Sequence, residues 1–143
     1  RVIGTQLYRI FGVFFTEAES KGTKYFGAKI IPARGVWIEI ASESDGVIYI
    51  RIEKKRKIPA TALLRAMGYE TNEMILEAFS KNVVAQEAMK NSLSKDGVKN
   101  VTDAYIEIYK RLRDGDMATA DNAKEFINSL FTAERYDLSL IHI

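Results

Sequence analysis

The chain has 143 residues, of which 47% are hydrophobic and 28% are charged, and its formal net charge is +2 at pH 7. This composition is sufficient for one hydrophobic core and excludes a chain that is disordered throughout. The absence of cysteine excludes disulfide bonds and thiolate metal sites, and fits a reducing, cytoplasmic location. No stretch reaches the roughly 18 apolar residues needed to span a bilayer, so we expect no membrane partner.

The N-terminal half has the pattern of β-strands. Short apolar and aromatic runs over residues 13–15 and 24–31 are separated by a polar stretch over 16–23, which predicts a loop. Residues 36–40 and 47–52 alternate apolar and polar side chains around an Asp-Gly pair that is typical of a hairpin turn. We therefore expect antiparallel strands within about residues 2–52.

The alternation in this hairpin assigns its side chains to two faces, because successive residues of a strand point to opposite sides. The isoleucines of both strands share one face. Trp37 and Glu39 share the opposite face with Tyr49 and Arg51. The sequence thus predicts that the only tryptophan points away from the aliphatic core.

The C-terminal half has helical periodicity over about residues 59–131, and we expect four to five short helices there. Pro59 suits a first helical position. Thr71, Thr102 and Thr119 are placed to cap later helices, and the strongest apolar stripe follows Thr102. The predicted fold class is α+β, with N-terminal antiparallel strands and a hairpin followed by a cluster of short helices.

The clearest local feature is the basic run Arg51-Ile52-Glu53-Lys54-Lys55-Arg56-Lys57, in which five of seven residues are cations. Adjacent cations repel one another unless a polyanion neutralises them, so the run indicates phosphate contact. A solvated turn between a strand and a helix explains the composition equally well.

Trp37 is the second candidate. An exposed indole beside a basic strand would offer a flat surface on which an unpaired base can stack. The alternative, which the usual burial of tryptophan favours, is that Trp37 packs beneath another element that covers the outer face of the hairpin.

The sequence predicts no catalytic residue and no metal or cofactor site. Its acidic residues lack the spacing of metal ligands or paired catalytic carboxylates, and it has no glycine-rich phosphate loop. The only histidine, His142, lies in residues 138–143, which match the translated end of a common sequencing adapter. We expect this tail to be non-native and residues 1–137 to form the domain.

Several collinear segments resemble one family, the β subunits of bacterial DNA-directed RNA polymerase. Residues 47–68 resemble the family stretch containing RIDRRRKLPATILLRALG, and residues 28–37 resemble ARIIPYRGSW. The other matching segments are 5–15, 105–116, 122–124 and 135–137. The resemblance spans residues 2–137 and corresponds to the part of the subunit called the lobe.

The resemblance implies a non-catalytic jaw beside the DNA cleft of a nucleotidyltransferase, in contact with downstream duplex DNA and the non-template strand. The tryptophan matching Trp37 would stack on an unpaired non-template base. The catalytic magnesium would be held by the other large subunit, and the partners would be the other polymerase subunits and a sigma factor, in the cytoplasm at the nucleoid. The residues expected along the DNA path are Trp37, Arg51, Lys54, Lys55, Arg56, Lys57, Arg9, Arg113 and Arg135.

A different hypothesis is a free-standing basic module, nucleic-acid-binding or regulatory, derived from the lobe. The chain starts at Arg1 without a methionine, and we expect it to be a fragment of a longer protein. The flanking coding sequence would separate the two hypotheses.

Overall fold

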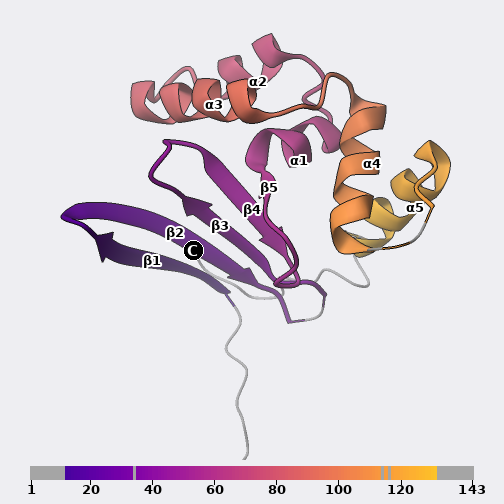
Figure 1. The fold of residues 1–143 in the computed structure, drawn as a ribbon, viewed down its shortest axis with the longest axis horizontal. Coiled ribbons are helices and arrows are strands. Elements are labelled where there is room, and N and C mark those ends of the chain that lie inside the picture. The colour runs from indigo at the N-terminus through magenta and orange to yellow at the C-terminus, as the bar shows by residue number, and fades with distance from the viewer. Residues whose placement is uncertain (1–11, 34, 114, 116, 132–143) are drawn as a thin grey trace, which may run out of the picture.

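The computed structural model describes residues 12–33, 35–113, 115 and 117–131. Within them, a five-stranded antiparallel sheet in the order β1-β2-β3-β4-β5 is followed by five helices (Figure 1). This arrangement confirms the predicted α+β class. The strands are β1 Gly12–Ser20, β2 Thr23–Ile31, β3 Ile38–Ser42, β4 Ile48–Ile52 and β5 Ile58–Pro59, and the helices are α1 Ala60–Ala66, α2 Asn72–Ala78, α3 Val83–Lys95, α4 Val101–Leu112 and α5 Ala120–Leu130.

The first hairpin shows that the predicted loop over residues 16–23 was wrong. β1 pairs with β2 along its whole length, and the chain reverses at Lys21 and Gly22, whose φ angles are 52° and 76°. Such a positive-φ pair matches the right-handed twist of the flanking strands. Polar residues can continue the strand because this ribbon extends away from the helices (Figure 1), leaving even Phe15 77% and Phe26 62% exposed.

The second hairpin confirms the predicted faces. Ile38 lies opposite Ile52 in the register of β3 and β4, and every isoleucine of these two strands is buried or half-buried. Glu39 lies opposite Arg51 on the other face. The turn lies at the predicted Asp-Gly pair, where Gly46 has a φ of 74°.

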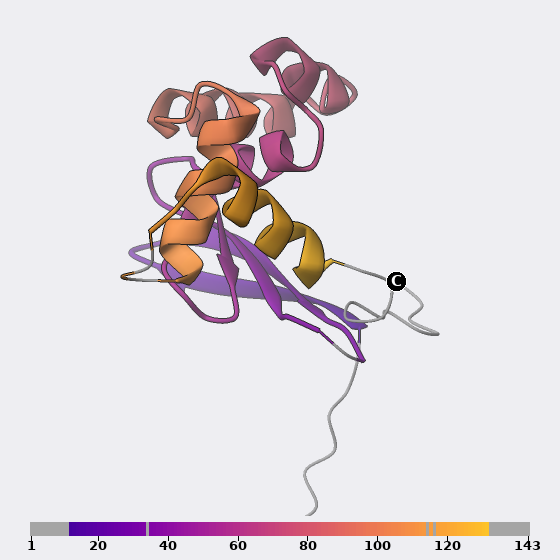
Figure 2. The same ribbon diagram turned by 90° about the vertical axis from the view of Figure 1, so that its right-hand side faces the viewer.

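The helices gather along the β4–β5 side of the sheet, while β1 and β2 form its far edge (Figure 1). α4 and α5 lie side by side (Figure 2), and the Tyr109 and Phe126 rings meet edge to face with centroids 5.4 Å apart. Within the described residues, this packing buries the larger of two hydrophobic clusters between the sheet and the helices. Its buried members include Ile38, Ile50, Ile52 and Ile58 of the sheet and Leu63, Ile75, Met89, Ile108, Ile127 and Leu130 of the helices.

Two of the four predicted helix starts were wrong. Thr71 and Thr119 cap α2 and α5 as expected. Thr102 lies inside α4, because the side chain of Asn100 accepts the backbone N–H of Asp103 at 2.8 Å and starts the helix earlier. Pro59 has an extended ψ of 138° and ends β5, so α1 begins at the next residue.

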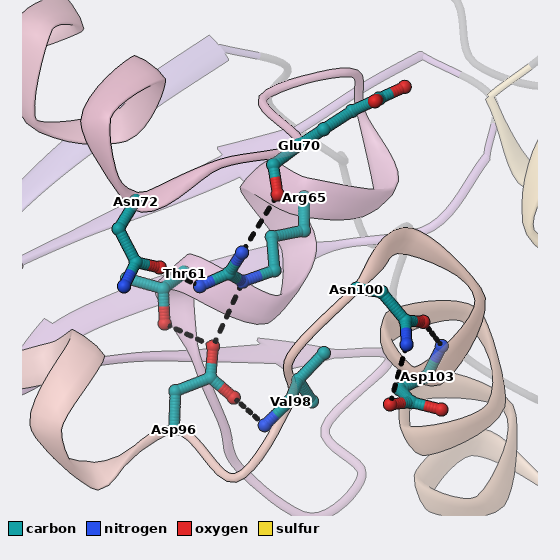
Figure 3. Close-up of polar contacts among 8 residues, drawn as sticks. All are labelled: Thr61, Arg65, Glu70, Asn72, Asp96, Val98, Asn100 and Asp103. Carbon is teal, nitrogen blue, oxygen red and sulfur yellow. Dashed lines mark hydrogen bonds and ion pairs between the residues drawn. The ribbon is translucent and has the colours of Figure 1, made fainter.

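A buried polar cluster joins the helices (Figure 3). Arg65 of α1 donates to the carbonyl of Glu70 at 2.8 Å and to the side chain of Asn72 at the start of α2. Its Nε lies 3.8 Å from the carboxylate of Asp96, which also accepts the Thr61 hydroxyl at 2.7 Å. Because Asp96 ends α3, the cluster fixes α1 relative to both α2 and α3.

Candidate nucleic-acid interface

The basic run begins with the last two residues of β4 and continues through the connection between β4 and β5, residues 53–57, which we call the basic turn. Lys55 N–H donates to the carbonyl of Ile52 at 3.1 Å and closes a tight turn, in which Glu53 and Lys54 have φ angles of 53° and 59°. Left-handed backbone costs a non-glycine residue on the order of 1–3 kcal/mol, so the neighbouring structure must hold this turn in place. Glu53 N–H donates to the carbonyl of Trp37 at 2.9 Å, which attaches the turn to the start of the neighbouring strand.

A surface hollow of about 530 Å³ lies beside this turn, and every side chain that lines it is a cation. Five of the six come from the predicted basic run, whereas the sixth comes from α4. A concave surface of one charge sign concentrates the field and attracts ligands of the opposite charge. The lining residues are Arg51, Lys54, Lys55, Arg56, Lys57 and Arg111.

Two of these cations are neutralised by acidic neighbours. Lys57 forms an ion pair of 2.6 Å with Glu43, and its Nζ lies 4.4 Å from the centroid of the Tyr49 ring. Arg111 pairs with Glu107 at 2.9 Å and donates to the backbone carbonyl of Lys57 at 3.3 Å. Lys57 and Arg111 therefore support the hollow, and the exposed cations around them are available to a polyanion.

Sequence reasoning missed Arg111. Its position in the last turn of α4 is explained sufficiently by the favourable interaction of a cation with the helix dipole. Its place in the hollow depends on the packing of α4 near the β4–β5 connection, and no local signal in the sequence indicates that packing.

Trp37 is half-buried. Its exposure therefore lies between the two predicted possibilities, an exposed indole and an indole packed beneath another element. It lines a second hollow, of about 270 Å³, together with Gly35, Val36, Glu53 and Lys54. The Nζ of Lys54 lies 5.2 Å from the centroid of its ring, within the range of a cation–π interaction. The structure thus brings the indole and the basic turn together.

Of the other predicted residues, one lines the basic hollow, one lies at the end of α4, and two lie outside the described residues. Arg51 is exposed and lines the basic hollow opposite Glu39 of β3. Arg113 is exposed at the end of α4, with its guanidinium 5.0 Å from the Phe126 ring, and does not line either hollow. Arg9 and Arg135 lie outside the described residues.

Two pKa shifts occur at the β3–β4 turn. The backbone N–H of Val47 donates to the Asp45 carboxylate at 3.0 Å and lowers the pKa of that carboxyl group. Burial, and then the hydrogen bond from its hydroxyl to Asp45, raise the pKa of Tyr49. Both shifts favour the protonation states that these groups have at neutral pH, so they indicate no acid–base chemistry at this turn.

The described part of the chain contains no group of three or more histidine, cysteine, aspartate or glutamate side chains that could hold a metal ion. It also contains no helix whose length and apolar character would let it cross a membrane.

The comparisons with known proteins agree with one another. The chain is 46% identical over 143 residues to the DNA-directed RNA polymerase subunit beta of Clostridium botulinum (strain Hall), an alignment that covers 99% of the chain and 11% of that subunit. It is 44% identical to the same subunit of Syntrophomonas wolfei, with 99% and 13% covered. The family model described as RNA polymerase Rpb2, domain 2, matches residues 12–142, and the chain therefore belongs to that family.

Proposed function

We propose that this chain is the lobe of a bacterial RNA polymerase β subunit, and that it lines the DNA cleft and contacts downstream DNA and the non-template strand during transcription. The similarity to subunits named DNA-directed RNA polymerase subunit beta supports the assignment to transcription. The observation that carries the DNA contact is the hollow lined only by cations, beside the half-buried indole of Trp37.

The two hollows fit the two parts of a nucleotide. The exposed cations of the basic turn can neutralise backbone phosphates and release the counterions bound to them, which makes the contact independent of sequence. The indole can stack on any base that is not held in a duplex. A single strand presents phosphates and free bases together, so the non-template strand of a transcription bubble is the form of DNA that suits both.

The chain would act without catalytic residues of its own. In the proposed assembly, phosphoryl transfer belongs to the whole nucleotidyltransferase, and the other large subunit holds the catalytic magnesium. The other polymerase subunits and a sigma factor would be the protein partners, at the nucleoid in the cytoplasm. The free-standing module derived from the lobe remains the alternative, and it predicts DNA binding without these partners.

A site-specific crosslink tests the DNA contact directly. A photoreactive amino acid in place of Lys55 should crosslink to the non-template strand in a promoter complex of the assembled polymerase. The control is the same substitution at Val83, which is exposed at the start of α3 and lines neither hollow. Equal crosslinking from both positions, or none from position 55, would contradict the proposal.

A further inference from the structure

We infer that Lys54 is a displaceable cover for the Trp37 ring, and that it couples base stacking to phosphate binding. The ligand it selects is a single strand that offers an unpaired base together with a neighbouring phosphate. The inference rests on the proposed DNA contact, and it assigns to Lys54 a role different from that of the other cations in the basic run.

The position of Lys54 carries the first step. Its ammonium lies 5.2 Å from the centroid of the Trp37 ring. The turn holds it there, because Lys54 follows Glu53 in the left-handed pair and the N–H of Glu53 is bonded to the carbonyl of Trp37. The backbone of the turn is thus attached to the residue whose ring the lysine covers.

The second step is that Lys54 borders both hollows. It lines the 270 Å³ hollow with Trp37 and the 530 Å³ hollow with the basic run, and among the described residues it is the only cation that lines both. A base that enters the smaller hollow therefore meets the ring and the ammonium together. A lysine that moves off the ring remains at the wall of the basic hollow.

The third step compares the two interactions that compete for the Trp37 ring, the cation–π contact of Lys54 and the stacking of a base. A cation over an aromatic ring at an exposed site is held more weakly than a stacked base. A base therefore displaces the ammonium, and the flexible stem of the lysine allows it to reach an adjacent phosphate. When the bound strand has no base at this position, nothing displaces the ammonium of Lys54 from the Trp37 ring. That complex therefore neutralises one phosphate fewer.

The test compares two DNA bubbles bound by the assembled polymerase. They are identical except that one carries an abasic site in place of an unpaired base at the downstream edge of the non-template strand. Affinity is measured over a series of salt concentrations. For the natural bubble, we expect the slope of log affinity against log salt to be steeper by about 0.7, the worth of one neutralised phosphate of a single strand.

Two lysine variants separate this inference from the proposed function. Lys54→Met should remove the difference in slope between the two bubbles. Lys55→Met is the matched control from the same turn, and it should lower both slopes by about 0.7 while the difference persists. Two outcomes would overturn the proposed role of Lys54. One is an equal salt slope for the two bubbles with the unsubstituted protein, and the other is a slope difference that persists in Lys54→Met. If Lys55→Met and Trp37→Ala change neither the affinity for the two bubbles nor its salt dependence, the proposed DNA contact itself fails.

Discussion

Within the described residues, the buried polar cluster around Arg65 and the basic turn hold their cations in opposite ways. Arg65 is only 4% exposed, and it is surrounded by the carbonyl of Glu70, the amide of Asn72 and the carboxylate of Asp96 (Figure 3). The basic turn is exposed, and within the described residues Lys55 and Arg56 form no ion pair.

The difference shows how a cation's surroundings separate structure from binding. A buried charge must be matched inside the fold, because its desolvation is otherwise too costly. Exposed cations remain hydrated and can exchange water and counterions for an external polyanion. The hollow beside the turn contains cations of both kinds. Lys57 and Arg111 are paired with acidic side chains, whereas the exposed cations of the turn are not.

The largest expected effect is on the buried cluster. Arg65→Met removes one partner of a buried ion pair and leaves the Asp96 carboxylate without its cation, which should cost about 3–5 kcal/mol of unfolding free energy. Denaturant titration of the chain would measure it. Lys55→Met is the control and should change the stability by less than about 0.5 kcal/mol, as surface substitutions usually do. Similar losses for both variants would remove the distinction between the clusters.

Trp37→Ala should have an intermediate effect, on binding. Loss of one base stack should weaken the open promoter complex of the assembled polymerase by about 1–3 kcal/mol. The lifetime of the complex after addition of a competitor would measure it. Trp37→Phe keeps an aromatic face and should retain part of the stability, whereas an unchanged lifetime for the alanine variant would count against stacking.

The smallest effect distinguishes cations within the hollow. Neutralising Lys55 and Arg56 should make DNA binding less dependent on salt, by about 0.7–0.9 in the log–log slope for each phosphate that is no longer bound. Lys57→Met should leave the slope nearly unchanged, because Glu43 already neutralises that lysine. Binding measured over a salt series would compare the variants. Equal changes for all three positions would mean that the acidic partners do not matter.

Prediction from the sequence succeeded where a local pattern had one physical explanation. The alternation around Ile38 and Ile50 determined the core face of the second hairpin, because an error of one residue would expose every isoleucine. It failed for the polar stretch of β1, because an exposed two-stranded ribbon does not require an apolar face. It also failed at Thr102, since Asn100 offered a competing cap.

The candidate site was predictable only in part. The basic run and Trp37 were visible as residue types, but Arg111 became part of the hollow only through the packing of α4 near the β4–β5 connection. The contact between Lys54 and the indole likewise depends on two left-handed residues. Non-glycine residues rarely adopt that conformation, so their identities did not indicate it.

The sequence by itself determined the α+β class, the core face of the second hairpin and the positive charge of the turn after it. Each of these follows from the periodicity or charge of neighbouring residues. The tertiary structure decided which cations are neutralised, which are exposed, and which one covers the tryptophan. Those properties depend on residues far apart in the chain, such as Lys57 with Glu43 and Arg65 with Asp96, and only folding brings such residues together.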